Sequence, residues 1–423
     1  MIGTTEKGQI LKPIHVGNYR EFAEVFGSGA EYTITNEAKH AFLNGVYEVV
    51  VVPIAGKGAE KAKQKLKDQS GADTVLLIAQ DPGRSGNKIA FGVEAGSVEN
   101  TVSIVVTDGG AMEAFENVVM DPKVGNYLVE AINSASSLIS AEDLNAKSKA
   151  PANNPALLEG SLAGGKDGEV SKDDFEKALE KLEGEPDVDM VLACGVSDPE
   201  IHALIDAHCQ NMSLDAKNRI GIGTVGVDES LEDICTRTTT LASDRFILVA
   251  PAGNAGAVAG LIGKLNYYES PTFKPIAGIS KIDVAYTPSE LAKLLNAGIL
   301  PLEAQRGRGI VVVKGITTSK EQISVQRIAD RSVRGVKNIS DLFIGTLNNE
   351  ANRIALNAKI TEFLMQMERE GSIVPSTDGT EPAFIIDVYS SQSDFAQGIV
   401  RIDMAVRPVR AIDYIYATIL VEA

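Results

Sequence analysis

The chain has 423 residues, of which 44% are hydrophobic, so it can bury a large core divided among two to four domains. Its formal net charge of -17 and its lack of Trp argue against a nucleic-acid-binding protein, which needs a basic face for phosphate contacts. The acidity is uneven, because residues 301–423 contain 14 Lys and Arg against 15 Asp and Glu. A strongly acidic part therefore precedes a nearly neutral C-terminal part.

The three cysteines, Cys194, Cys209 and Cys235, are too few and too scattered for a disulfide framework or a zinc site, which favours a reducing compartment. Residues 1–8 lack the basic segment and apolar stretch of a signal peptide. The chain also has no run of 18 consecutive apolar residues. We therefore expect a protein that is neither secreted by a signal peptide nor membrane-spanning.

The first segment predicts an open α/β arrangement. Helices are expected over 19–26, where Gly27 stops the helix, and around 37–43. The continuous β-branched run over 47–54 is typical of a strand covered on both faces. A charged helix over 57–67 and an apolar strand over 74–79 are expected next, before Asp-Pro-Gly-Arg-Ser-Gly ends the pattern.

After this break the periodicity changes to short strands over 89–93 and 102–106, with glycine-rich turns. A helix is expected over 127–139, and residues 140–170, rich in Ala, Asn, Gly and Ser, predict a long loop that returns the chain to the main domain. These features predict that roughly residues 84–150 form a β-rich insertion.

Strands and helices then alternate again along the chain, and this alternation predicts a parallel sheet. Ser171 and Asp174 resemble a capping box, and Thr287 is placed to cap the first helix of a final domain. That domain is expected to contain one long helix from about 339 to 369 and two closing strands. The expected strands cover 190–194, 220–225 and 245–250, and the expected helices cover 173–182, 199–209 and 231–241.

We therefore predict a multi-domain α/β fold: an open α/β core with an inserted small β-rich domain and an α+β C-terminal domain. The core is discontinuous, over 1–84 and 151–286. The inserted domain covers 85–150, and the C-terminal domain covers 287–423.

Three glycine-containing segments resemble ligand-binding motifs only in part. Residues 221–226 have the spacing of a dinucleotide fingerprint, but the following Val-Asp-Glu-Ser looks like a turn, so turn glycines are the better account. Residues 256–264 fail as a phosphate loop, because Val258 and Leu265 occupy positions that need Gly and Ser or Thr. Residues 163–174 lack the first two ligands of a calcium loop, which favours a turn before a capped helix.

No segment gives a positive sign of catalysis. His202, His208 and Cys209 cluster on one predicted helix, but the two histidines are six residues apart and do not share a face cleanly. We interpret them as partly buried helix residues, since a metal site or a Cys/His nucleophile needs further partners. We predict no catalytic residue, cofactor-binding residue or metal ligand, and no enzyme activity.

A basic stretch stands out in the acidic chain over 306–337, with eight Lys and Arg against Glu321 and Asp330. Arg327, Arg331 and Arg334 have helical i, i+4, i+7 spacing, and Lys337 continues the run. The simplest interpretation is a solvated helix face. The alternative is a docking surface for an acidic partner.

The C-terminal residues alternate as strands do. Val400, Ile402, Met404 and Val406 fall on one face of a first strand. A second β-rich run covers 414–421. Such strands can pair within a domain or extend a neighbour's sheet, because unpaired edge groups are a template for another strand. The alternating positions of the second run are Tyr414, Tyr416, Thr418 and Leu420.

The order of several short segments resembles contractile tail sheath proteins over most of the chain. In the C-terminal domain these are residues 309–315, Gln326-Arg327-Ile328, 343–346 and Asn348. Upstream, the resemblance rests on residues 2–8, 86–87, 113–117, 164–168 and 295–299. Each segment is weak alone, and their order and spacing carry the resemblance.

The resemblance implies a structural subunit that polymerises as stacked hexameric rings around an inner tube and contracts to drive the tube through a target envelope. Its implied partners are further copies of itself, the inner tail tube protein, and baseplate and sheath terminator proteins, with no nucleic acid and no membrane insertion. It implies assembly in the bacterial cytoplasm and residence in a virion tail or contractile injection particle.

The resemblance further implies that the strands near 400–406 and 414–421 join neighbouring subunits. The charge pattern leads us to expect that Arg327, Arg331, Arg334 and Lys337 face the tube. Family members usually carry an arm before the segment that begins here at Met1, so the usual donor strand would be missing or the chain would be incomplete. Two other functional classes stay open: an enzyme that binds a nucleotide at 221–226, and an α/β binding module that does not polymerise.

Overall fold

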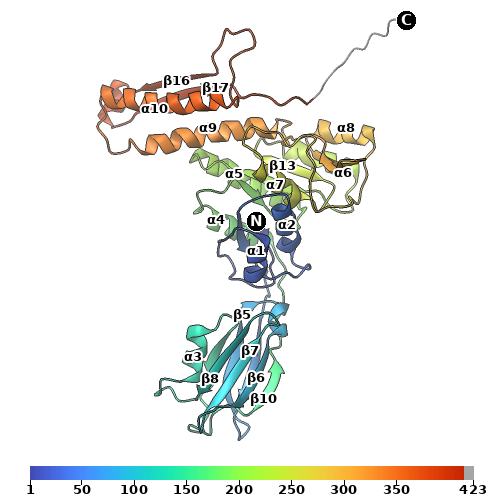
Figure 1. Ribbon diagram of the computed structural model, residues 1–423, viewed down its shortest axis with the longest axis vertical. Helices are drawn as coiled ribbons and strands as arrows, with labels where there is room; N and C mark the ends of the chain where they lie inside the picture. Colours follow the sequence, from blue (N-terminus) through green and yellow to red (C-terminus); the bar gives the residue numbers. More distant parts are fainter. Residues whose placement is uncertain (414–423) are drawn as a thin grey trace.

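The structure, a computed structural model, describes residues 1–413 and has an elongated shape with an α/β core at its centre (Figure 1). A β-rich domain lies at one end, and the C-terminal helices and strands lie across the other (Figure 1). The predicted multi-domain α/β fold is confirmed. None of the described helices is both long enough and apolar enough to cross a bilayer.

The core is built on a five-stranded sheet in the order β11-β12-β13-β14-β15. The pairs from β11 to β14 are parallel, as predicted, and β15 is antiparallel to β14. A second sheet, β1-β3-β2, continues it through a bridge between Ile2 and Ala193. The core strands are β1 (Ile2–Gly3), β2 (Ile14–Val16), β3 (Val49–Pro53), β11 (Met190–Leu192), β12 (Ile220–Thr224), β13 (Phe246–Ala250), β14 (Leu300–Gln305) and β15 (Gly309–Val312).

Helices cover the core sheet on both faces and enclose two apolar clusters. The predicted capping boxes are present at Ser171 and Thr287, where each side chain and the acidic residue three positions on complete the first turn of a helix. The core helices are α1 (Tyr19–Phe26), α2 (Thr33–Leu43), α4 (Lys172–Leu182), α5 (Pro199–Leu214), α6 (Leu231–Thr240), α7 (Ala255–Lys264) and α8 (Pro288–Ala297).

The β-rich domain is a sandwich of two sheets, β4-β5-β9 and β10-β6-β7-β8, around one apolar cluster. Two backbone-to-side-chain hydrogen bonds join Asn133 of α3 to Ala141 of β9, so this helix covers the outer edge of β9. The elements are β4 (Lys61–Lys67), β5 (Asp73–Pro82), η1 (Arg84–Lys88), β6 (Ala90–Ala95), β7 (Val102–Thr107), β8 (Met112–Val118), α3 (Leu128–Ala135), β9 (Ile139–Asp143) and β10 (Leu158–Ser161).

The helix predicted over 57–67 is wrong, because β4 occupies Lys61–Lys67. Its lysines favour a helix by propensity, but every second residue from Lys61 to Lys67 is exposed, as in a strand with one covered face, and β4 pairs with β5. The predicted loop over 140–170 likewise contains β10, although its residues are polar and glycine-rich. Because the apolar cluster runs from Ala62 to Leu162, we propose that the inserted domain extends from β4 to β10, beyond the predicted 85–150.

The C-terminal module, defined as residues 323–409, contains α9 (Ile323–Asp341), α10 (Glu350–Arg369), β16 (Phe384–Tyr389), α11 (Gln392–Ala396) and β17 (Arg401–Val406). A single helix from 339 to 369 was predicted, and this is wrong because two helices meet at a turn. Gly345 has a positive φ of 82°, and the Asn349 side chain caps α10 by accepting from the Asn352 amide.

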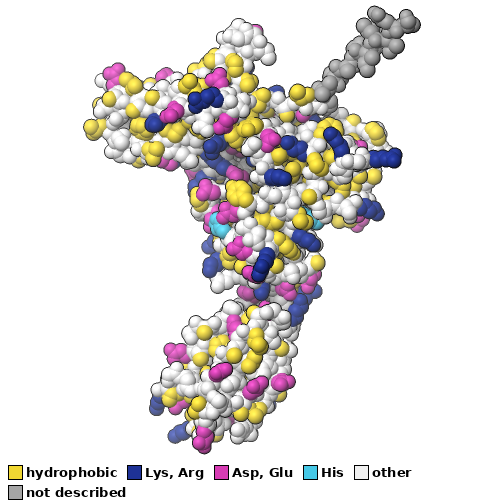
Figure 2. All heavy atoms as spheres, in the orientation of Figure 1, with side chains coloured by type: hydrophobic (Ala, Val, Ile, Leu, Met, Phe, Trp, Pro, Cys, Tyr) yellow, Lys and Arg dark blue, Asp and Glu magenta, His cyan; other side chains and the backbone are white. Residues whose placement is uncertain are grey.

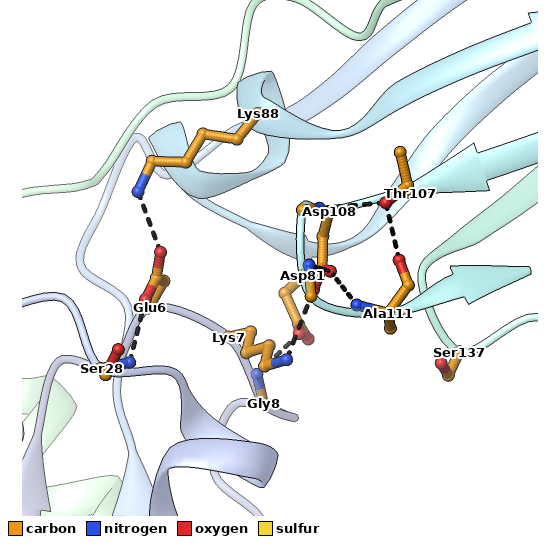
Figure 3. Close-up of polar contacts among 12 residues, drawn as sticks. Glu6, Lys7, Gly8, Ser28, Asp81, Lys88, Thr107, Asp108, Ala111 and Ser137 are labelled. Carbon is orange, nitrogen blue, oxygen red and sulfur yellow. Dashed lines mark hydrogen bonds and ion pairs between the residues drawn. The ribbon is translucent and has the colours of Figure 1, made fainter.

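Polar contacts connect the inserted domain to an N-terminal loop of the core (Figure 3). Glu6 accepts from Lys88 at 2.9 Å and from the backbone amide of Ser28, while Lys7 pairs with Asp108 at 3.4 Å. Burial is the largest single influence on both carboxyl groups and raises their pKa, but hydrogen bonds outweigh it. The pKa of Glu6 is lowered by Lys88 and by backbone amides, and the pKa of Asp108 is lowered by the Ala111 and Gly110 amides and then by Lys7. We call this set of contacts, together with the 2.6 Å bond from the Gly8 amide to Asp81, the polar clasp.

Replacing Lys88 by Glu is expected to loosen the polar clasp, because the new carboxylate would face Glu6. We expect a loss of about 1 kcal/mol of contact energy between the domains, with each domain still folded. Small-angle scattering should then show a larger radius of gyration and a broader distance distribution than for the wild type. Lys123→Glu, which makes the same charge change elsewhere on the inserted domain, is the control. Identical scattering profiles for Lys88→Glu and the control would contradict the role of the clasp.

Candidate functional site

Helix α9 begins inside the core and leaves it to carry the rest of the C-terminal module (Figure 1). Ile323, the first residue of α9, is fully buried in the core. Two turns further along the helix, Asp330 forms an ion pair with Arg245 at 2.5 Å. Asn218 also donates to Asp330 at 2.9 Å. Burial raises the pKa of Asp330, and the Arg245 guanidinium opposes that rise. We call Asp330, Arg245 and Asn218 the α9 anchor, because they fix where the helix leaves the sheet.

The predicted basic stretch lies on α9, but much of it serves contacts within the chain. Arg327 donates to the carbonyls of Leu265 and Asn266, each at 3.1 Å, and is half-buried. Arg334 contacts the Asp189 carboxylate and the Asn218 carbonyl. These two arginines therefore hold α9 on the core, which spacing along one helix could not reveal.

Arg331 and Lys337, the other two of the four residues predicted to face the tube, are exposed. The Arg331 guanidinium lies over the rings of Tyr267 and Phe363, at 5.9 and 5.8 Å from their centroids. Among residues 1–413, Lys337 forms an ion pair only with Asp341, one turn along the same helix. A cavity of about 410 Å³ lies beside Arg331, and Arg327 and Arg334 also line part of it. Of the four predicted residues, Arg331 and Lys337 are thus the ones available to a partner.

The predicted alternation in the first C-terminal strand is present in β17, which pairs antiparallel with β16 from Phe384–Val406 to Tyr389–Arg401. Val400, Ile402, Met404 and Val406 pack against the apolar cluster that α10 supplies. Among residues 1–413, β16 and β17 form a two-stranded sheet, and neither pairs with a third strand. Both outer edges therefore offer unpaired backbone groups. Tyr414, Tyr416, Thr418 and Leu420 lie outside the described residues.

Large apolar side chains are exposed around this two-stranded sheet, and the sequence analysis did not identify them. They lie in the α9–α10 turn and on the outer face of the hairpin. The period-two alternation of β16 could have indicated that Ile385 is exposed. Exposed apolar groups that gather in one region are typical of a protein-binding surface. They are Leu342 at 77%, Ile344 at 79%, Leu347 at 75%, Ile385 at 61% and Phe395 at 58% exposed.

The segment 221–226 does not form a phosphate-binding turn. Gly221 and Gly223 lie within β12, where a Cβ atom would come within 2.6 Å of Phe246 and His202, respectively. Gly221 and Gly223 therefore leave room for the side chains of His202, from α5, and Phe246, from β13, to pack closely against β12. The prediction that they are turn glycines is wrong, because the strand extends through them.

The segment 256–264 forms α7, as the small-residue interpretation predicted. A Cβ atom on Gly256 or Gly260 would come within 2.3 Å of a backbone carbonyl of α2. The Gly256 amide donates to the buried Glu37 carboxylate at 2.5 Å, and burial raises the pKa of that carboxyl group. Residues 163–174, which were considered as a calcium loop, form no such loop. Isolated β-bridges pair residues 163, 166 and 169 with residues 63, 60 and 57.

The histidines on α5 are buried, as is Cys209. His202 lies 3.2 Å from the Val196 carbonyl, and His208 lies 2.9 Å from a nitrogen of the fully buried Arg219. Burial lowers the pKa of each histidine to about 4. Among the described residues, no group of three or more His, Cys, Asp or Glu side chains is arranged to hold a metal ion.

These lowered pKa values predict a loss of stability in acid. An unfolded histidine binds a proton near pH 6.5, whereas His202 and His208 stay neutral in the folded chain down to about pH 4. The unfolded state therefore binds more protons, and the free energy of unfolding falls as the pH drops from 6.5 to 4, by a few kcal/mol.

Replacing His202 by Phe, which cannot titrate, is expected to remove about half of this pH dependence. Urea unfolding of both proteins at pH 7 and pH 5 measures it. His15, whose pKa is raised by Glu185 and Glu48, acts in the opposite direction but is the same in both proteins and cancels. Equal losses of stability between the two pH values would contradict a neutral, buried His202.

Comparison with known proteins shows that part of the chain is similar to tail sheath proteins. Residues 168–318 match the family model described as the phage tail sheath protein central domain. A tail sheath protein of Staphylococcus phage Twort is 25% identical over 200 residues, which cover 41% of this chain. That match spans only 34% of the length of the phage protein.

Solved structures extend the likeness to almost the whole chain. A sheath tail protein from Listeria innocua superposes with a TM-score of 0.70 at 14% identity, covering 97% of this chain and 91% of the other. The helical sheath of the anti-feeding prophage in its contracted state gives a TM-score of 0.56 at 14% identity, covering 99% of this chain and 91% of that one. The predicted resemblance is confirmed: this chain has the fold of contractile tail sheath proteins, and its residues 168–318 match the model of their central domain.

Proposed function

We propose that the chain is a structural subunit of a contractile tail sheath, with a mechanical and not a catalytic role. The observation that carries the proposal is the C-terminal module, which projects a two-stranded sheet from the core and leaves both of its outer edges unpaired among residues 1–413. A projecting sheet of this kind is suited to accept a strand from another copy. The sheath fold of the whole chain supports the same role.

In this proposal the subunits form stacked hexameric rings around an inner tube, and contraction of the assembly drives the tube through a target envelope. The strand region 400–406 accepts or donates an edge to neighbouring copies, and 414–421 does the same. Stored energy resides in two alternative packings of the same subunits, so no cofactor is needed. The particle assembles in the bacterial cytoplasm and becomes a virion tail or an injection particle.

The partners proposed beyond further copies are the inner tube protein and the baseplate and terminator proteins at the two ends. The exposed Arg331 and Lys337 are the part of the basic stretch that we assign to the tube. Arg327 and Arg334 contribute indirectly, because they hold α9 in position.

Truncation after Asp413 tests the strand-exchange part of the proposal. Because β16 and β17 complete their pairing before this residue, the truncated chain should keep the wild-type circular dichroism spectrum and melting temperature. It should lose polymer formation, measured as protein pelleted by ultracentrifugation. A truncated chain that polymerises as well as the full chain would contradict a joining role for 414–421.

The double variant Arg331→Glu/Lys337→Glu tests the tube contact. It is expected to weaken sheath formation on the tube about tenfold through charge reversal, with the α9 anchor unchanged. Co-sedimentation with purified tube measures the effect. The control is Lys359→Glu/Arg369→Glu, which makes the same charge change on the neighbouring helix α10. Equal co-sedimentation of the two variants would contradict the assignment.

A further inference from the structure

The two outer faces of the inserted domain carry opposite charge. Its sandwich buries one side of each sheet in a shared apolar cluster, so the other sides point away from each other. On the three-stranded sheet, every second residue of β4 is an exposed lysine. We call these the lysine row: Lys61, Lys63, Lys65 and Lys67.

The lysine row is continuous and is mostly uncompensated within the chain. Successive members are about 6.6 Å apart along the strand, so the row extends over about 20 Å. Among the described residues, only Lys65 of the row forms an ion pair, with Asp73 at 3.1 Å. Lys63 and Lys65 lie opposite Ile78 and Leu76 of β5, which are half-buried. The face thus combines four cations with a short apolar strip and with two carboxylates, Asp73 and Glu142, so that the cations are in excess.

The outer face of the four-stranded sheet has the opposite character. Its strands contain no Lys or Arg, and Glu94, Glu116 and Glu159 are exposed on this face without ion pairs among the described residues. Register brings Glu94 and Glu159 close, since Glu159 lies opposite Gly92, two residues before Glu94 on β6. Glu116 follows Phe115, which lies opposite Ile104 on β7, the strand that pairs with β6. In Figure 2, Asp and Glu side chains lie over the part of the domain where Figure 1 labels β6, β7 and β8.

We call Glu94, Glu116 and Glu159 the acidic sheet face. Val105 and Ala114 lie opposite each other within it, on β7 and β8. This pair supplies an apolar strip that matches the one beside the lysine row. The two faces are therefore complementary in charge and similar in construction.

We infer that the inserted domains of neighbouring copies stack head to tail, with the lysine row of one copy against the acidic sheet face of the next. Complementary patches on opposite sides of one module generate a heterologous contact, which repeats into a ring or a helix. In the isolated chain the lysines of the row repel one another, as do the glutamates of the acidic sheet face. Contact with the oppositely charged face of a neighbouring copy would reduce both repulsions. This inference rests on the proposed function, because it adds a contact between copies to the assembly.

Charge-reversal variants of the full chain test the contact. Lys63→Glu/Lys67→Glu places two glutamates in the lysine row beside Lys61 and Lys65, and Glu94→Lys/Glu116→Lys places two lysines on the acidic sheet face beside Glu159. Each variant alone should need about tenfold more protein to polymerise than the wild type, since several exposed ion pairs become repulsive. An equimolar mixture of the two should polymerise like the wild type, because opposite faces then alternate. Lys123→Glu/Lys147→Glu, with the same charge change elsewhere on the domain, should behave as the wild type.

Ultracentrifugation over a range of protein and salt concentrations gives the readout, and equal melting temperatures show that the variants fold. Unchanged polymerisation of both variants would overturn the stacking contact and leave the sheath proposal standing. Failure of the wild type itself to polymerise would overturn both. If Lys63→Glu/Lys67→Glu polymerises normally but no longer binds dextran sulfate, the lysine row serves a polyanion and the stacking contact is wrong.

Discussion

The buried carboxylate of Asp330 is the contact on which the geometry of the C-terminal module depends. It lies where α9 leaves the core, and its partners Arg245 and Asn218 precede two adjacent strands of the main sheet. Removing one partner of a buried ion pair costs about 3–5 kcal/mol, because the other charge is left unpaired in a poorly solvated site. The direction of α9, and with it the position of the projecting β-sheet, is therefore tied to the sheet of the core.

The opposite end of the molecule is connected more weakly. The polar clasp consists of partly exposed ion pairs and backbone hydrogen bonds, and an exposed ion pair contributes about 0–1 kcal/mol. The chain thus has a stiff connection to the C-terminal module, the surface that we propose joins neighbouring copies, and a softer one to the inserted domain. In a sheath, the first property would transmit motion between copies, and the second would let the inserted domains adjust to one another.

Local sequence patterns predicted the parts of the fold that depend on local periodicity. The apolar runs at 220–225 and 245–250 are strands of a parallel sheet, and the caps at Ser171 and Thr287 begin helices. The prediction of a helix at β4 was wrong, because lysine favours a helix by propensity while pairing with the next strand, β5, decides the outcome. Fold class and family relationship were thus accessible before the structure was known.

The functional surfaces depended on contacts that sequence spacing does not encode. Arg327 and Arg334 share a helical stripe with Arg331, yet their partners come from residues 189, 218, 265 and 266. Gly221 and Gly223 matched a nucleotide fingerprint, and only the packing of Phe246 and His202 explains them. The alternation of Val400 to Val406, by contrast, was readable because a half-buried strand has a strict period of two.

Electron microscopy of the full chain, expressed alone and together with its tube protein, tests the central claim most directly. The account predicts hollow striated cylinders, or sheathed tubes on co-expression, in which the C-terminal module of each copy contacts its neighbours. Small discrete particles under both conditions, at every protein concentration, would contradict a polymer-forming sheath subunit.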